Sequence, residues 1–280
     1  MDSAYYNNVD SFKMSTMNEQ SLQKPVVLVF AGHDPSGGAG IQADIETLAA
    51  LGCIATSVIT SLTAQNTQLF SYHLPQTKND FVSQTKLILG DIDIDACKIG
   101  AIGSPELILA IHEIITDQTF QLVIDPVLHS TTGHDFASEE MCGLLCELLL
   151  PLATVITPNR DEAMQLTGEL HPQAAAEKFL AMGCKNILIT DAEESETQII
   201  NHLYQQDGSC QTSTWERLPG NFHGSGCTLA SAIAANLAKN IELIPAIEQA
   251  QEFTWNSLKH GFHLGKGQMH PNRFFNLIEN

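Results

Sequence analysis

Positive charge is the scarcest property of this 280-residue chain, which has 13 lysines and arginines against 32 aspartates and glutamates. The net charge of −19 leaves no basic surface that could displace counterions from a nucleic acid, so nucleic-acid binding is excluded as a working hypothesis. Arginine occurs only as Arg160, Arg217 and Arg273, too few for a phosphate site made of several guanidinium groups. A bound polyphosphate would therefore have to be neutralised mainly by backbone amides and a divalent cation.

Long apolar runs are also missing. No run is long enough to span a membrane, and the first 24 residues lack the apolar core of a signal peptide. The seven cysteines form no CxxC pair of the kind that binds zinc, and their odd number does not suggest a disulfide framework. These absences predict a cytoplasmic protein with reduced thiols, no membrane partner and a flexible N-terminal tail over residues 1–24.

Short apolar runs alternate with helical patterns through most of the remaining chain. Strands are predicted at Val26–Phe30, Ile54–Ser61, Ala96–Ile99, Leu122–Ile124, Thr154–Ile156 and Asn186–Ile189. Helices are predicted at Ile41–Leu51, Phe81–Leu89, Pro105–Ile115, Ser138–Leu149, Pro172–Met182, Cys227–Ala238 and Pro245–Leu258. An antiparallel hairpin is predicted from Gln198–Tyr204 and Gln211–Arg217. This order indicates one α/β domain over residues 25–280, with a mostly parallel sheet, helices on both faces and the hairpin at an edge.

The most informative motif is His223-Gly224-Ser225-Gly226-Cys227, which is followed at once by a run of small residues. The two glycines leave backbone amides uncovered where a helix is predicted to begin, which is typical of an anion site. Cys227 falls on the first helical turn, where the helix field is expected to favour its thiolate. An anion site beside an ionisable group suits phosphoryl transfer, although the same glycines would also serve a plain tight turn.

Three other polar clusters follow predicted strands, and the carboxyl ends of parallel strands meet at one edge of a sheet. The first is Gly32–Gly40, which is neither a Walker loop nor a Rossmann fingerprint, because it lacks the spacing of both. Its glycines would let the backbone approach a small substrate, with Asp34 and Asp44 nearby. Gln65 offers amide groups that suit a flat heterocycle. Asp44 would equally well complement a helix dipole, and Gln65 would fit an ordinary polar loop.

The other two clusters supply carboxylates. Asp125 follows one strand, and Asn159 and Glu162 are spaced to share one face of a helix. Such a set suits Mg²⁺ bound through water together with the phosphates of a nucleotide. Capping of the helix by Asn159 explains part of the pattern equally well. The eleven histidines form no HExxH motif, which argues against a zinc site.

The chain resembles the ribokinase-like superfamily and, within it, the hydroxymethylpyrimidine and phosphomethylpyrimidine kinases of thiamine biosynthesis. The resemblance covers Val26 to Ala238 in the family's order. The matching stretches are Ala31–Asp44 (AGHDPSGGAGIQAD), Thr56–Thr67, Lys98–Gly100, Val123–Val127 (VIDPV), Ile156–Glu162 (ITPNRDE) and His223–Thr228 (HGSGCT). It implies a three-layer α/β/α sandwich and a homodimer. It also implies ATP-dependent phosphorylation of 4-amino-5-hydroxymethyl-2-methylpyrimidine, and then of its monophosphate to the diphosphate.

The same resemblance assigns roles to residues. It implies an aminopyrimidine pocket, Mg-ATP at a second set of positions, an anion hole at the glycine turn, and Cys227 in the place of the catalytic base. The pocket residues are Gly32, Asp34, Asp44, Gln65 and Val127. The ATP residues are Asp125, Asn159, Glu162 and Thr190, of which Asp125 and Glu162 would hold the metal. The anion hole consists of Gly224, Ser225 and Gly226.

The chain departs from the family in ways that keep alternatives open. Ala101 stands where many members have methionine, and Thr190–Glu193 replaces a Lys-Gly-Gly-His stretch near the nucleotide. A lysine usual after Val127 is missing too. A kinase restricted to the monophosphate step and a pyridoxal kinase are therefore alternatives. A pyrimidine-binding regulator without catalysis is less favoured, because the glycine turn is intact. A cysteine hydrolase is also less favoured, because nothing marks His223 as paired with Cys227.

Overall fold

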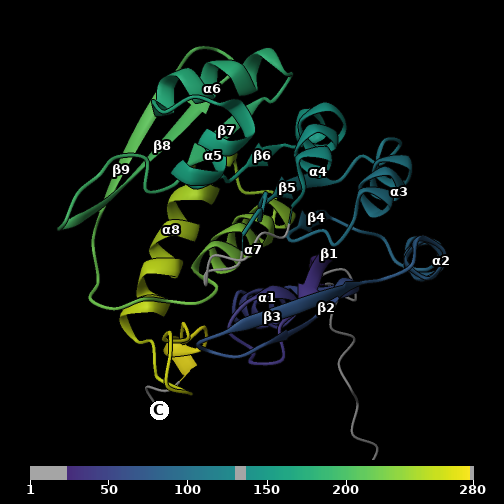
Figure 1. Ribbon diagram of the computed structural model, residues 1–280, viewed down its shortest axis with the longest axis horizontal. Coiled ribbons are helices and arrows are strands. Elements are labelled where there is room, and N and C mark those ends of the chain that lie inside the picture. The colour runs from purple at the N-terminus through teal and green to yellow at the C-terminus, as the bar shows by residue number, and fades with distance from the viewer. Residues whose placement is uncertain (1–23, 130–136, 278–280) are drawn as a thin grey trace, which may run out of the picture.

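The computed structural model describes residues 24–129 and 137–277, in which nine strands form one sheet (Figure 1). The strand order is β3-β2-β1-β4-β5-β6-β7-β8-β9. The parallel strands are β1 (Val26–His33), β2 (Ile54–Gln65), β4 (Ala96–Ile99), β5 (Gln121–Ile124), β6 (Val155–Ile156) and β7 (Asn186–Ile189). The antiparallel strands are β3 (Phe70–Pro75), β8 (Gln198–Gln205) and β9 (Cys210–Glu216).

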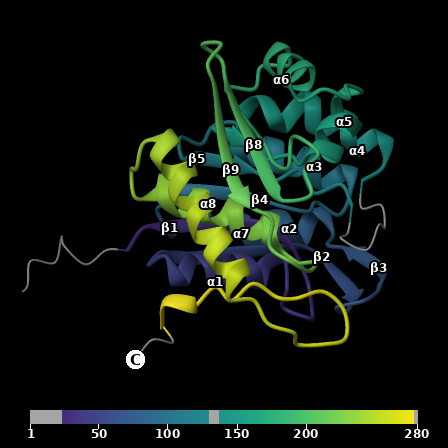
Figure 2. The ribbon, with the colours of Figure 1, turned by 90° about the vertical axis from the view of Figure 1, so that its left-hand side faces the viewer.

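Helices cover both faces of the sheet (Figures 1 and 2). One layer consists of α1 (Gly40–Ala50), α7 (Ser225–Ala238) and α8 (Leu243–Lys259). The other consists of α2 (Lys78–Leu89), α3 (Pro105–Ile115), α4 (Glu139–Leu144), α5 (Arg160–Thr167) and α6 (Pro172–Ala181). The predicted three-layer α/β/α arrangement is therefore confirmed. No helix in the described part of the chain is long and apolar enough to cross a membrane.

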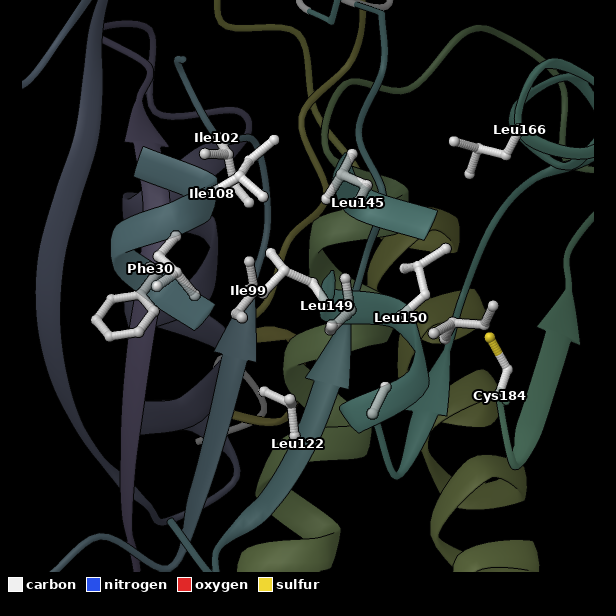
Figure 3. Packing of buried hydrophobic residues seen from close by; sticks show 14 of the residues in the cluster. Phe30, Ile99, Ile102, Ile108, Leu122, Leu145, Leu149, Leu150, Leu166 and Cys184 are labelled. Atoms are coloured by element: carbon white, nitrogen blue, oxygen red, sulfur yellow. The ribbon is translucent and has the colours of Figure 1, made fainter. Parts of the chain in front are cut away.

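Alternation along the strands divides the core between the two layers. Val27 and Val29 of β1 pack with α1, α7 and α8, whereas Leu28 and Phe30 point to the opposite layer. There the rings of Phe30 and Phe81 meet edge to face, with their centroids 5.1 Å apart. Figure 3 shows part of this second cluster, with Ile99 and Leu122 from strands and Ile108, Leu145 and Leu149 from helical turns. Because helices cover both faces of the sheet, successive side chains of a strand are all buried, and the strands read as continuous apolar runs. Burial of each such side chain contributes about 1.5–3 kcal/mol.

Most of the predicted elements are present, with two differences. Strand β3 was not expected, because Phe70–Pro75 is short, partly polar and ends in proline. It pairs antiparallel with β2, where Leu62 lies opposite Leu74, so both edges of the sheet are antiparallel. The helix predicted at Ser138–Leu149 is divided into α4 and a π-helical turn, Leu145–Leu149. The tail predicted over residues 1–24 lies outside the described residues, except for Lys24.

Candidate active site

A cavity of about 480 Å³ opens at the carboxyl ends of the parallel strands. This is the edge at which open α/β sheets bind their ligands, and the volume falls in the usual range for small molecules. Loops far apart in the sequence meet there. Its lining includes Gly32, Asp34, Gln65, Lys98, Ala101, Asp125, Val127, Asn159, Glu162, Thr190, Gly224, Ser225, Gly226 and Cys227. The structure thus brings together every predicted site residue except Asp44.

The glycine turn before α7 has the form that an anion site needs. Gly224 precedes the helix in the left-handed region, with φ of +87°, and no side chain caps the helix start. A Cβ on Gly224 would lie 2.0 Å from the carbonyl oxygen of Gly38, so only glycine fits. The hydroxyl of Thr228 donates to the Gly224 carbonyl at 2.8 Å and holds the turn against the helix. The first-turn amides of α7 are therefore left for a ligand in the cavity.

Asp34 organises the glycine-rich loop from within. Its carboxylate accepts bonds from the Ser36 and Ala39 amides and the Ser36 hydroxyl, and His223 Nε2 lies 2.9 Å from Oδ2. Although burial opposes ionisation, the bonds from His223 and Ala39 hold the pKa of Asp34 at about 2. The Asp34–His223 contact joins the loop after β1 to the turn before α7. These partners occupy both carboxylate oxygens of Asp34. Its predicted contact with a substrate stays a prediction.

Lys98 forms part of the cavity floor and was not singled out from the sequence. Its ammonium lies 2.8 Å from Asp44 Oδ1, and both side chains are fully buried. Ser231 of α7 donates to the same oxygen at 2.7 Å. Asp44 is therefore behind the cavity wall and bonded to protein groups, so its predicted contact with a pyrimidine stays untested. A lysine inside the apolar strand Ala96–Ile99 was the available signal, because such a charge requires a buried partner.

The electrostatics of Cys227 correct one expectation. Burial raises the pKa of its thiol to about 11, against the opposing effects of the Lys98 charge and of a hydrogen bond from the Gly40 amide. The expectation that the helix field would favour the thiolate is therefore wrong for this state of the protein. Desolvation outweighs the positive groups, and Asp44 and Asp125 add to the rise.

Two buried carboxyls, Asp125 and Glu162, line the same cavity as the glycine turn. Burial raises the pKa of Asp125 to about 6, and burial together with the Asp125 charge raises that of Glu162 to about 8. Glu162 also completes a capping box: Glu162 Oε2 accepts from the Asn159 amide, and Asn159 Oδ1 accepts from the Glu162 amide, both at 2.9 Å. The capping interpretation is therefore confirmed. The roles of Asn159 and Glu162 toward ATP remain predictions.

A second cavity, of about 870 Å³, continues from the first and shares Asn159, Thr190, Ser225 and Gly226 with it. Further in, it is lined by the chain's two tryptophans, Trp215 and Trp255, whose ring centroids are 6.3 Å apart. Arg160 and Arg217 line it as well, and Arg217 Nη2 is 2.6 Å from Asp191 Oδ1. Arg217 thus contacts the Thr190–Glu193 segment directly, and Arg160 pairs with Glu194, the residue that follows it.

The opposite end of the first cavity has a small-residue wall. A Cβ on Gly32 would lie 3.9 Å from the Cβ of Ala101 and 3.1 Å from the Ser61 hydroxyl. Gln65 ends β2 on this side, and its amide nitrogen donates to the Thr63 hydroxyl at 3.0 Å. Val127 lines the same cavity after β5. This end of the cavity is therefore lined by small side chains, with the Gln65 side chain also in the lining.

Comparison with known proteins gives a consistent result. The family model described as phosphomethylpyrimidine kinase matches residues 34–272. The hydroxymethylpyrimidine/phosphomethylpyrimidine kinase of Haemophilus influenzae is 36% identical over 86% of this chain and 93% of its own.

Two solved structures are also similar. An ADP complex of Bacillus subtilis pyridoxal kinase has a TM-score of 0.81 and 30% identity, covering 91% of this chain and 100% of that one. Phosphomethylpyrimidine kinase from Clostridium difficile has a TM-score of 0.73 and 33% identity, covering 84% and 100%. The resemblance inferred from the sequence motifs is confirmed.

Proposed function

The chain belongs to the phosphomethylpyrimidine kinase family and is a phosphotransferase, and on this basis we propose its substrates and the roles of its residues. It transfers the γ-phosphoryl group of ATP to the hydroxymethyl oxygen of 4-amino-5-hydroxymethyl-2-methylpyrimidine. A second transfer, to a phosphate oxygen of that product, gives the diphosphate. In each step a bond forms from phosphorus to the acceptor oxygen while the bond to the bridging oxygen of ADP breaks, and the first step also releases the hydroxyl proton.

The observation that carries the proposal is the position of the glycine turn between the two cavities. Ser225 and Gly226 line both of them. The pyrimidine would occupy the first cavity, beside Gly32 and Val127, and the nucleotide base would occupy the second cavity, which the two tryptophans line. The transferred group then passes the first-turn amides of α7, which are placed to stabilise its charge. An ADP complex of the similar Bacillus subtilis enzyme supports a nucleotide in this fold.

The donor set near Asn159 fits Mg²⁺. The two raised pKa values, at Asp125 and Glu162, indicate clustered carboxyls that a dication would help to ionise. Among the described residues no cluster of three or more such side chains could hold a metal alone, so water and ATP phosphates would complete the shell. Glu162 is engaged with backbone amides, which favours binding through water. When bound, the ion supplies charge neutralisation for the phosphates.

The test is an ATP-consumption assay with hydroxymethylpyrimidine, its monophosphate and pyridoxal as separate acceptors. We expect turnover with both pyrimidines and formation of the diphosphate. Activity with the monophosphate alone would instead support a one-step kinase. Preference for pyridoxal would contradict the proposed substrate and would show that the space left by Ala101 admits the more heavily substituted pyridine ring.

Tryptophan emission offers a second readout of the same proposal. The chain has two tryptophans, and both line the second cavity. ATP with Mg²⁺ should therefore change the intrinsic fluorescence, whereas a pyrimidine alone should change it less. A pyrimidine that binds in calorimetry without any ATP turnover would favour a non-catalytic regulator and contradict the proposed function.

Replacement of Cys227 by alanine should affect the two transfers unequally. The first transfer must remove a proton from an alcohol, whereas the phosphate oxygen of the second substrate is already ionised at neutral pH. In the proposed mechanism the buried Cys227 thiol, whose pKa is raised in the ligand-free protein, gives up its proton once the substrates are bound and then acts as the base of the first transfer. General-base contributions are about 10²-fold or more, so we expect a loss of this order in the first rate and less than about tenfold in the second. Both half-reactions are measured at saturating ATP.

Cys210→Ala is the matched control, because Cys210 is an exposed free cysteine on β9. It should leave both rates unchanged. Equal losses of the two rates in Cys227→Ala would reject the asymmetry and leave Cys227 a packing role at the helix start.

We also propose a homodimer that meets through the outer face of β2 and β3. Leu62 and Leu74 are cross-strand neighbours, and together with Tyr72 they are at least half exposed. Strand β3 has no charged residue and lies at the sheet edge, which suits contact between two acidic chains. A monomeric mass in sedimentation would contradict this.

The single domain over residues 25–280 and the cytoplasmic location remain proposals. The first is supported by one sheet that carries the whole site, and the second by seven free thiols.

A further inference from the structure

The C-terminal segment that follows α8 returns to the candidate active site. Met269 pairs with the residues just before the glycine turn: its amide donates to the Asn221 carbonyl at 2.8 Å, and its carbonyl accepts from the His223 amide at 2.9 Å. The amide of Gln268 donates to Thr67, beyond β2, at 3.0 Å. Figure 2 shows this segment passing beside α1. It is therefore attached to the segment that leads into the glycine turn and to the loop after β2, the strand whose last residue, Gln65, lines the cavity.

Arg273 is the buried cation of this segment. Its side chain is 1% exposed, and its three nitrogens reach three different elements. Nη2 donates to the Gly38 carbonyl at 2.5 Å, Nε donates to the Thr228 hydroxyl at 3.0 Å, and Nη1 lies 3.0 Å from Glu46 of α1. The charge is thus neutralised by Glu46, while the other two bonds hold the glycine-rich loop and the first turn of α7.

The Gly38 carbonyl also lies where the two loops come closest, because it is the group that a Cβ on Gly224 would strike. Thr228, the other partner of Arg273, donates in turn to the Gly224 carbonyl at 2.8 Å. One guanidinium therefore fixes the carbonyl that packs on Gly224 and, through Thr228, the carbonyl of Gly224 itself. The planar fork spreads its donors over three nitrogens and so reaches both groups as well as Glu46, whereas a lysine carries all its donors on one nitrogen.

From these contacts we infer that Arg273 is a positioning residue for phosphoryl transfer. It holds the glycine turn before α7, here also called the anion turn (Gly224, Ser225 and Gly226), at its working distance from the glycine-rich loop. The inference rests on the proposed function of that turn. Arg273 does not line either cavity and acts only through the loops it joins. Because a displacement of about 1 Å in a positioned group costs about 10²-fold in rate, a clamp of this kind is expected to govern kcat.

The test compares full-length Arg273→Ala with Arg273→Lys and Glu46→Gln. In Arg273→Ala we expect kcat to fall by about tenfold or more, with the KM for the pyrimidine changed less than about twofold. Millimolar guanidinium chloride should restore several-fold of that kcat, because the ion can enter the space left by the side chain and donate to Gly38 and Thr228. Urea at the same concentration should not. Arg273→Lys should retain an intermediate kcat.

Glu46→Gln is the matched control, because it removes the ion pair but leaves both loop bonds in place. It should lower the melting temperature while keeping kcat near that of the unchanged protein. An unchanged kcat in Arg273→Ala, measured below its melting temperature, overturns the inference. A loss that guanidinium leaves unrepaired also overturns it, since it would reflect general damage to the fold.

Failure of the proposed function gives a different result. If the unaltered protein phosphorylates neither pyrimidine, the affinity for Mg-ATP is read from tryptophan emission in the same variants. A weaker affinity in Arg273→Ala that guanidinium recovers upholds the positioning role, and an unchanged affinity overturns it.

Discussion

Gly224→Ala is expected to lower kcat by about a hundredfold or more in both transfers, which is the effect of losing a preorganised anion donor. The added Cβ would stand 2.0 Å from the Gly38 carbonyl and 3.0 Å from the Ala39 Cα, so backbone would have to move. The φ of +87° adds strain of about 1–2 kcal/mol for any residue with a Cβ. Relief of the clash and of the backbone strain requires the glycine turn to move away from the loop after β1. Steady-state kinetics with each pyrimidine measures the loss.

Two further glycine variants separate the site from the fold. Gly143→Ala is the matched control, because a Cβ there meets nothing within 4 Å and no left-handed φ is involved. It should keep full activity and stability. Gly226→Ala fits the protein, since its Cβ would lie 3.6 Å from Asp125 Oδ2, an ordinary contact. Its fold should be intact, yet its methyl group would occupy space between the turn and Asp125 and lower kcat. Full activity in both Gly224→Ala and Gly226→Ala would rule out the anion turn as the transfer site.

The layers and the strand ends were predictable because they follow from local patterns. Ala96–Ile99, Pro105–Ile115 and Asn186–Ile189 have the same bounds in the structure as in the prediction. Apolar runs bounded by turn residues identify buried strands, and proline after Ser104 marks a helix start. The polar clusters directly follow the predicted strands. Because the carboxyl ends of parallel strands lie at one edge of a sheet, the positions of the strands predicted which residues line the cavity.

What could not be predicted depends on contacts between distant segments. Lys98 meets Asp44 from 54 positions away, and Arg273 meets Gly38 from 235 positions away. No local sequence pattern identifies the partner of either residue, because the packing of helices on the sheet determines which distant residues meet. The raised pKa of Cys227 has the same origin. A helix start favours a thiolate, but the burial that outweighs it appears only when the cavity is formed.

Lys98→Met should be the most destabilising of the substitutions considered. Lys98 and Asp44 are each fully buried, and Asp44 Oδ2 has no hydrogen-bond partner among the residues that the structure describes. Removal of the ammonium leaves a buried carboxylate with only the Ser231 hydroxyl to stabilise it. Loss of one member of a buried pair costs about 3–5 kcal/mol, a large part of the free energy of unfolding of a typical domain. Urea denaturation at neutral pH measures this loss.

The double variant Lys98→Met, Asp44→Asn tests the cause. Asparagine is neutral and can still accept from Ser231, so the double variant should regain more than half of the stability lost in Lys98→Met. That recovery would show that the cost comes from the stranded charge. If methionine at position 98 alone left the free energy of unfolding within about 1 kcal/mol of the unchanged protein, Asp44 would have to take up a proton at little cost. The buried ion pair would then not be what holds β4 to α1 beneath the anion turn.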